Sequence, residues 1–204
     1  MLIQLNKENP DQRVIDQITK QLSKGAVIIY PTDTVYALGC SLHQKRAIEK
    51  IAKIKGLKLK KAHFSLMCYD LSTLSDYTNF IDRPTYKLLR KNLPGPFTFI
   101  LPASTRIPKL FDSNKKSVGI RIPDSNIVKE IVKSLGHPMV TSSLHDDDEI
   151  LEYTTDPYVI EEKWKNEVDL IIDGGYGKNE PSTVIDCSQG DFQIVRQGIG
   201  ELLY

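Results

Sequence analysis

The first candidate for chemistry is a short polar segment that follows an apolar run. Residues 26–30 read Ala-Val-Ile-Ile-Tyr, which is typical of a buried strand, and Pro31 ends that strand because proline has no N–H for the ladder. Three hydroxyls and one carboxylate then fall within five positions: Thr32, Asp33, Thr34 and Tyr36. Open α/β sheets place ligands at the carboxyl ends of strands. Two interpretations stay open: a binding loop, or a turn whose side chains satisfy local backbone groups.

The second candidate is a lysine-rich segment that follows a helix predicted over residues 44–54. Five lysines crowd nine positions around Gly56: Lys53, Lys55, Lys58, Lys60 and Lys61. Runs of one charge are commonly solvated loops, whereas the functional interpretation is a clamp for phosphate groups. The order of strand, polar loop and helix resembles the unit that places phosphates at a helix start, although the glycine-rich P-loop pattern is absent.

Arg121 is the third candidate, because it stands between apolar neighbours in a strand predicted over residues 118–122. An arginine in an alternating strand commonly points outward into solvent. The alternative is that it points inward at an anion, which its planar fork of donors suits. The sequence pattern leaves both orientations open.

Small hydroxyl residues also end a strand predicted over residues 139–144: Thr141, Ser142 and Ser143. They indicate a second binding loop. Residues 145–149 then read His-Asp-Asp-Asp-Glu, but they lack the spaced ligands and the glycine of a calcium loop. A solvated acidic turn is therefore the favoured interpretation, and no metal ligand is predicted there.

A sheet and its helices must position these candidates. Hydrophobic patterning predicts further strands over residues 2–5, 64–69, 97–101, 168–173, 183–186 and 192–195. Further helices are predicted from a capping signature at residues 9–12 to Gly25, and over residues 83–93, 127–136 and 157–165. The fold class is therefore α/β, with a twisted open mixed sheet and flanking helices. The length of 204 residues suits a single domain over residues 1–204.

Composition excludes some partners. The 27 basic and 26 acidic side chains give a net charge of +1, which favours neither nucleic acid nor a membrane surface. The three cysteines, Cys40, Cys68 and Cys187, have no CxxC spacing and lie in or beside apolar runs, as reduced core thiols do. With no signal sequence and no long apolar window, a cytoplasmic location without membrane contact is expected.

Seven sequence blocks carry a family resemblance. They are PTDTVYALGC at 31–40, KIK at 53–55, PGPFTFIL at 94–101, GIRIP at 119–123, TSSL at 141–144, PSTVID at 181–186 and VRQGIG at 195–200. In this order and spacing they resemble the YrdC-like family, and the SLMC run and the YALGC ending resemble its YciO branch. The resemblance implies a YrdC/RibB-like fold with a concave basic cleft.

The resemblance also implies an activity, the synthesis of threonylcarbamoyl-AMP and pyrophosphate from L-threonine, bicarbonate and ATP. The product serves the threonylcarbamoyl modification of adenosine 37 (t6A) in tRNA. This reaction joins two anions, a carbamate and the α-phosphate of ATP, so cations and amide dipoles are needed to offset their repulsion. No side-chain nucleophile is required, and catalysis rests on positioning and charge stabilisation.

The matched blocks imply a role for each candidate. Arg121 holds the threonine carboxylate as a bidentate pair, and Lys53 and Lys55 neutralise the phosphates; these three are the implied catalytic residues. The amino-acid pocket is implied to be lined by Thr32, Thr34 and Tyr36. The nucleotide is implied to contact Ser142, Ser182 and Arg196, with Mg²⁺ held chiefly by ATP oxygens.

Three departures separate this chain from the synthase pattern. Leu144 stands where the synthases carry asparagine, and the loss of such a donor typically costs about 10²- to 10³-fold in rate. Lys55 replaces an arginine, which removes a planar fork, and Cys68 stands about where the synthases often have histidine. These changes imply a weaker or altered synthase. The alternative is a non-catalytic module that binds double-stranded RNA or tRNA through the basic cleft.

Overall fold

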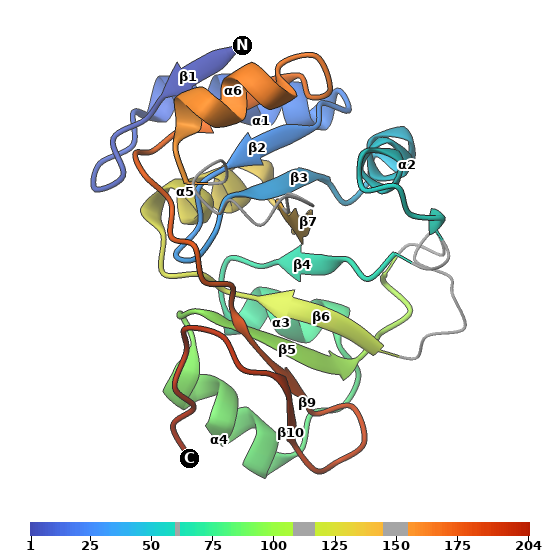
Figure 1. Cartoon of the computed structure of the whole chain (residues 1–204). Coiled ribbons are helices and arrows are strands. Elements are labelled where there is room, and N and C mark those ends of the chain that lie inside the picture. The colour runs from blue at the N-terminus through green and yellow to red at the C-terminus, as the bar shows by residue number, and fades with distance from the viewer. Residues whose placement is uncertain (60–61, 108–116, 145–154) are drawn as a thin grey trace.

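One mixed sheet runs through the structure, a computed structural model that describes residues 1–59, 62–107, 117–144 and 155–204 (Figure 1). Its ten described strands lie in the order β1-β8-β2-β3-β7-β4-β6-β5-β9-β10. In chain order their bounds are Leu2–Gln4 (β1), Ile28–Tyr30 (β2), Ala37–Ser41 (β3), Ser65–Met67 (β4), Phe97–Pro102 (β5), Ser117–Arg121 (β6), Met139–Ser143 (β7), Leu170–Asp173 (β8), Thr183–Asp186 (β9) and Gln193–Arg196 (β10). Four neighbouring pairs are parallel and five are antiparallel, so the predicted mixed sheet is confirmed.

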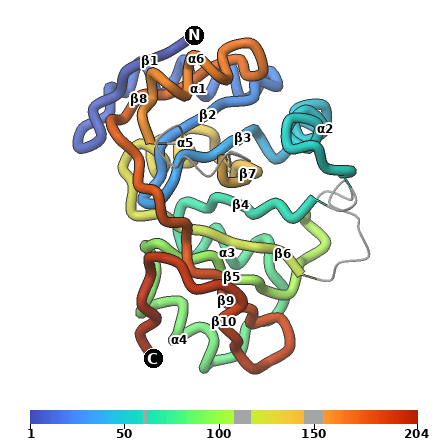
Figure 2. The backbone as a smooth tube through the Cα atoms, viewed as in Figure 1, coloured from blue at the N-terminus to red at the C-terminus, as the bar shows by residue number. Residues whose placement is uncertain are grey.

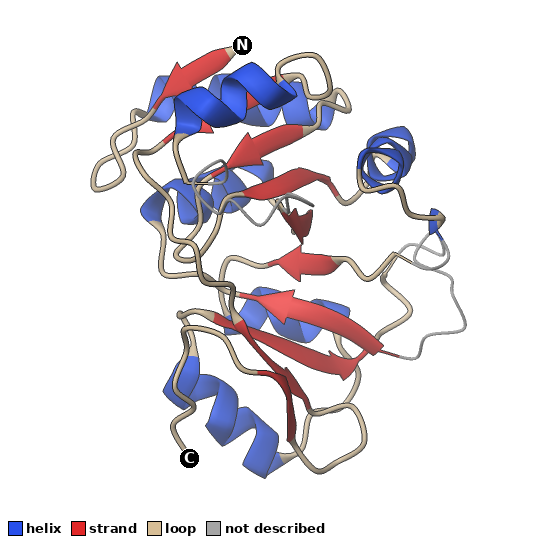
Figure 3. Ribbon diagram, in the orientation of Figure 1, coloured by secondary structure: helices blue, strands red, loops and turns tan. Residues whose placement is uncertain are grey.

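Six described helices flank the sheet (Figure 3). They are Gln12–Ser23 (α1), Lys45–Ile54 (α2), Leu71–Tyr77 (α3), Arg83–Asn92 (α4), Asn126–Leu135 (α5) and Pro157–Trp164 (α6). Aspartate side chains cap α1, α3, α4 and α6 by accepting a backbone N–H of the first turn, which stabilises each helix start by about 1 kcal/mol. The chain ends beside α4 (Figure 2), where Asn92 donates to the carbonyl of Leu203 at 2.8 Å.

The two faces of the sheet bury different helices. On one face, α1 and α5 pack over β2 and β8, where strand alternation points Ile28 and Tyr30 toward them. On the other face, Ile29 joins a core that includes residues of α2, α3, α4 and α6. In β7, Met139 belongs to the α1 and α5 side, so Thr141, two residues on, lies on that same face. Beyond β7, Met67 of β4 still belongs to this core, and the rest of this face is lined by polar and apolar side chains such as Ser65, Thr98 and Ile100.

Two elements escaped the sequence patterns. Residues 37–41 form β3, which pairs antiparallel with β2, so the polar loop is a hairpin connection and the expected strand-loop-helix unit is wrong. Gly39 permits this pairing, because a Cβ there would lie 2.6 Å from the ring of Tyr30. The helix α3 was also not predicted; its seven residues are too short for a clear helical period.

A histidine pair beside the end of β3 predicts a pH-dependent stability. The rings of His43 and His137 meet edge to face at 4.3 Å, and His137 Nε2 lies 3.4 Å from Ser41 Oγ. Burial lowers the pKa of His137, and the charge of His43 lowers it further, while the bond to the Pro138 carbonyl opposes both. The folded state therefore resists a proton that the unfolded chain accepts near pH 6.5.

The free energy of unfolding is accordingly expected to be full above pH 6.5 and to fall as the pH drops below it, because the unfolded state then binds more protons. Urea unfolding between pH 5 and pH 8 measures this slope. The variant His137→Gln serves as the control and is expected to flatten the slope. An equal slope in the wild type and in His137→Gln would contradict the assignment.

Candidate functional site

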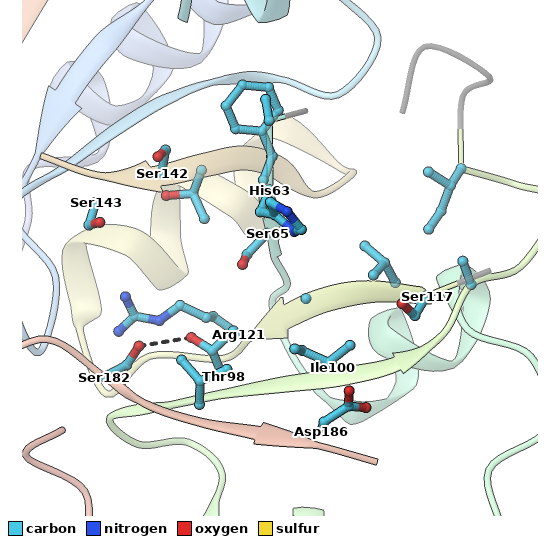
Figure 4. A pocket seen from close by; sticks show the side chains of 18 of the residues that line it. His63, Ser65, Thr98, Ile100, Ser117, Arg121, Ser142, Ser143, Ser182 and Asp186 are labelled. Atoms are coloured by element: carbon cyan, nitrogen blue, oxygen red, sulfur yellow. Dashed lines mark hydrogen bonds between the residues drawn. The ribbon is translucent and has the colours of Figure 1, made fainter. Parts of the chain in front are cut away.

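A cavity of about 740 Å³ opens over five neighbouring strands, β7, β4, β6, β5 and β9 (Figure 4). In β5 and β9 alternate residues line it, as expected for one face of a sheet, whereas β6 and β7 also contribute consecutive residues near their ends. The polar lining includes Ser65, Thr98, Ser117, Arg121, Thr141, Ser142, Ser143, Ser182, Asp186 and Arg196. Among the described residues, the lining thus combines two arginines, many hydroxyls and one carboxylate, which suits an anionic ligand with further polar groups.

Gly119 forms the floor of this cavity in the middle of β6. A Cβ built on Gly119 would lie 2.5 Å from Ser65 Oγ and 3.4 Å from Thr98 Cγ2. Its φ lies outside the left-handed region, so glycine is needed here for space and not for backbone conformation. The missing side chain at Gly119 therefore lets Ser65 and Thr98 lie close over the backbone of β6.

Arg121 is buried and points at an anion supplied by the chain itself. Its Nη2 donates to Asp33 Oδ1 at 2.7 Å and to Thr34 Oγ1 at 3.1 Å. The side chains of Arg121 and Asp33 are only 8% and 7% exposed. The Nε of Arg121 is buried and has no hydrogen-bond partner among the described residues. Of the two orientations left open by the sequence, the inward one is therefore observed.

The predicted amino-acid pocket residues lie behind this ion pair. Thr32 donates to the carbonyl of Val35 at 2.7 Å, so the contact between Thr32 and Thr34 at 3.1 Å makes Thr34 the donor. Thr34 then accepts from Arg121. Both hydroxyls are therefore used inside the protein, and neither Thr32 nor Thr34 is among the described residues that line the cavity. Their direct contact with substrate stays a prediction, while their support of Arg121 is observed.

Tyr36 is fully buried and also lies outside the described cavity lining. Its hydroxyl donates to the carbonyl of Gly175 at 2.7 Å. Burial is the main cause that raises the pKa of Tyr36, so the phenol stays protonated and keeps this bond. Tyr36 thus ties β3 to the end of β8, and its predicted substrate contact is untested.

Arg196 and Ser182 reach the cavity from the far edge of the sheet. Arg196 Nη2 donates to the carbonyl of Ser182 at 2.7 Å, and Ser182 Oγ lies 2.8 Å from Thr98 Oγ1 (Figure 4). Arg196 belongs to the exposed strand β10; its partial burial lowers its pKa, and the nearby charge of Arg121 lowers it further. The two arginines therefore act on the same space, which is the setting for two anionic groups.

The predicted nucleotide residues divide into two groups. Ser142, Ser182 and Arg196 line the cavity together with Arg121. Lys55 lies at the end of α2, where its Nζ donates to the carbonyl of Ser143 at 3.0 Å, and Lys53 is exposed in the last turn of α2. Both lysines lie outside the described cavity lining. Lys60, Lys61 and residues 145–149 lie outside the described part of the chain.

Leu144 does not face the cavity in the described structure. Its side chain is 2% exposed within the main core, and its N–H donates to the carbonyl of Tyr36 at 2.9 Å. Cys68 is likewise buried, and its N–H donates to the carbonyl of Arg121. The departures from the synthase pattern at these two positions are therefore changes in packing beside the site.

A buried hydrogen-bond relay fixes the polarity of Thr141 in the cavity wall. Thr141 Oγ1 donates to the carbonyl of Leu38 at 3.2 Å, so it accepts from the Tyr30 hydroxyl at 2.7 Å. Burial is the main cause that raises the pKa of Tyr30, which keeps the phenol as the donor. Thr141 can therefore only accept a hydrogen bond from a ligand, for example from an amine or another N–H group.

Clustered metal ligands are absent from the described residues. Within the described residues, no group of three or more histidine, cysteine, aspartate or glutamate side chains lies close enough to hold a metal ion. Asp186 lines the cavity at the end away from Arg121 (Figure 4), and one of its oxygens already accepts from the N–H of Ser188.

No described helix combines the length and the apolar character needed to cross a membrane.

The sequence patterns had already named six of the cavity residues: Arg121, Thr141, Ser142, Ser143, Ser182 and Arg196. They missed others, including Ser65, Thr98, Gly119 and Asp186, and they named Asp33 without its pairing to Arg121. Three of the missed residues, Thr98, Gly119 and Asp186, lie inside the quoted blocks. Along their strands they alternate with residues that pack in the core, or they share a face with a residue that was named. Strand alternation within each block was the signal that could have found them.

Comparisons with known proteins find a family model and similar proteins that cover nearly the whole chain. A family model named after Sua5, YciO and YrdC, with the description telomere recombination, matches residues 20–198. The uncharacterized protein YciO of Escherichia coli K12 is 40% identical over 201 residues, which are 97% of this chain and 95% of YciO. The crystal structure of E. coli YciO superposes with a TM-score of 0.91 at 39% identity, covering 98% of this chain and 97% of that one.

Two more distant relatives have names that state an activity or a ligand. A threonylcarbamoyl-AMP synthase of Vibrio vulnificus YJ016 is 27% identical over 187 residues, which are 90% of this chain and 98% of the synthase. The crystal structure of P. abyssi Sua5 complexed with L-threonine has a TM-score of 0.85 at 22% identity, covering 99% of this chain and 62% of Sua5. The second likeness shows a shared fold.

Proposed function

Because the chain belongs to the Sua5, YciO and YrdC family, we propose that it forms threonylcarbamoyl-AMP and pyrophosphate from L-threonine, bicarbonate and ATP. The family resemblance predicted from the sequence blocks is confirmed, whereas the activity is inferred. A named synthase at 27% identity supports it. The product would serve threonylcarbamoyl modification of tRNA, and the cytoplasm is the proposed location.

The observation that carries this proposal is the pair of arginines in one hydroxyl-lined cavity. The reaction requires the carbamate of threonine to approach the α-phosphate of ATP, and two such anions repel by several kcal/mol in a partly dry cleft. Arg121 and Arg196 supply two fixed cations that face the same space. Preorganised donors of this kind stabilise a transition state without rearrangement.

Each substrate has residues of suitable chemistry. The threonine carboxylate is proposed to bind the free edge of Arg121, and its nitrogen to donate to Thr141, which offers only an acceptor. Thr32, Thr34 and Tyr36 hold this subsite from behind. How completely water is excluded from the carbamate then depends on how well the substrates fill the cavity.

The nucleotide is proposed to occupy the remaining cavity. Arg196, Ser142 and Ser182 would contact its phosphates, and Lys53 and Lys55 at the end of α2 would neutralise phosphates that extend beyond the cavity. Mg²⁺ is proposed to be held by ATP oxygens, since a carboxylate cluster is lacking within the described residues. When bound, Mg²⁺ neutralises the phosphates and helps pyrophosphate leave.

Equilibrium binding separates this proposal from the alternative of an RNA-binding module. Isothermal titration with ATP and Mg²⁺ is expected to show ATP binding that L-threonine tightens, because both ligands share one cavity. L-valine serves as a matched control that lacks the hydroxyl. Salt-sensitive affinity for double-stranded RNA or tRNA, together with no affinity for ATP, would contradict the synthase and favour the RNA module.

A further inference from the structure

The two arginines of the cavity differ in their counterions. Arg121 forms an ion pair with Asp33 at 2.7 Å, and both side chains are more than nine-tenths buried. Within the described residues, the hydrogen bonds of Arg196 go to neutral oxygens of Ser182, at 2.7 Å and 3.4 Å. The charge of Arg121 is therefore partly compensated by Asp33, whereas Arg196 has no carboxylate partner among the described residues.

Asp33 is fixed in this role by its own contacts. Its Oδ1 accepts from Arg121, and its Oδ2 accepts from the N–H of Asp124 at 3.2 Å. Thr34 accepts a second bond from the same Nη2 of Arg121. Because the Asp33 side chain is buried and Asp33 is not among the described residues that line the cavity, it acts as a counterion of Arg121 and not as a ligand for a substrate amine. The guanidinium is thereby held by one edge, and its buried Nε stays without a partner among the described residues.

From this difference we propose that Asp33 is a positioning and specificity-determining residue that sorts the two anionic substrates between the two arginines. This inference rests on the proposed function. A phosphate chain bound at Arg121 would lie close to the negative charge of Asp33. Like charges repel strongly at short distance in a buried site. A carboxylate carries one charge and matches the fork of Arg121. Phosphates are consequently directed to Arg196, and the amino acid is directed to Arg121.

The test removes the charge of Asp33 and keeps its shape. In Asp33→Asn, inorganic pyrophosphate is expected to bind at least about tenfold more tightly than in the wild type, and to become competitive with L-threonine. In the wild type, pyrophosphate is expected not to compete with L-threonine. Titration calorimetry with pyrophosphate, with and without L-threonine, measures both effects. Competition of this kind is a change that a merely structural role of Asp33 would not produce.

The matched control is Asp124→Asn, which removes an exposed charge from the loop that contacts Asp33. It is expected to leave both affinities unchanged. Asp33→Ser repeats the test with a smaller neutral side chain if Asp33→Asn does not fold. Unchanged pyrophosphate affinity in a folded Asp33 variant, or an equal change in Asp124→Asn, would overturn the inference. If the wild type does not bind L-threonine, the proposed function fails, and the pyrophosphate affinities still decide the role of Asp33.

Discussion

Arg121→Ala is expected to weaken L-threonine binding by about 100-fold and to lower the free energy of unfolding by about 3 to 5 kcal/mol. The binding loss follows from the removal of charge-assisted hydrogen bonds to the substrate carboxylate. The stability loss follows because Asp33, with its side chain 7% exposed, would become an unpaired buried carboxylate. Calorimetric titration with L-threonine and urea unfolding measure the two effects.

Two further variants separate binding from stability. Arg121→Lys keeps a positive charge near Asp33 but loses the planar fork, so it is expected to recover part of the stability and little of the L-threonine affinity. Arg106→Ala is the control, because Arg106 also pairs with an aspartate, at 2.6 Å, but on the exposed surface. Unchanged L-threonine affinity in Arg121→Ala would contradict the placement of the amino acid at Arg121.

Gly119→Val is expected to abolish ligand binding through loss of space. A Cβ at this position would already lie 2.5 Å from Ser65 Oγ, and the two added methyl groups would extend into the cavity. A displacement of a substrate by about 1 Å costs about 100-fold in rate, so a loss of at least this size is expected for binding or turnover. Overpacking is expected to cost about 1 to 3 kcal/mol of stability. Titration with ATP and urea unfolding measure both.

A smaller change at the same position provides the control. Gly119→Ala adds only the Cβ, and combining it with Ser65→Ala removes the hydroxyl that this Cβ would meet. The double variant is expected to keep more ATP affinity than Gly119→Ala alone. Full ATP affinity in Gly119→Val would show that the ligand does not use this floor of the cavity.

The sheet was largely predictable because most of its strands are apolar runs with clear ends. Proline, glycine and small hydroxyl residues mark those ends, and the strand at residues 26–30 illustrates it. The exception is β3, whose sequence Ala-Leu-Gly-Cys-Ser contains a glycine and follows a polar loop, so its local pattern resembles the end of a turn. It becomes a strand because β2 and β7 pair with it on both sides.

The site was predictable only in part, because a sequence pattern does not show which group a polar side chain meets. Arg121 could be named, but its partner Asp33 lies 88 positions away and was read as part of a local loop. Thr32 and Thr34 were expected to face substrate, yet the hydroxyl of each is hydrogen-bonded within the protein. Gly119 carries no functional group, so only the neighbours of its backbone reveal what it does.

The proposed reaction converts L-threonine, bicarbonate and ATP into threonylcarbamoyl-AMP in this cavity, and formation of that product can be measured directly. The measurement is pyrophosphate release from ATP and Mg²⁺, with and without L-threonine and bicarbonate, together with mass spectrometry of the nucleotide product. We expect pyrophosphate release that depends on L-threonine, and a product with the mass of threonylcarbamoyl-AMP. Pyrophosphate release that is independent of L-threonine, or no release under conditions where the named synthases react, would contradict it.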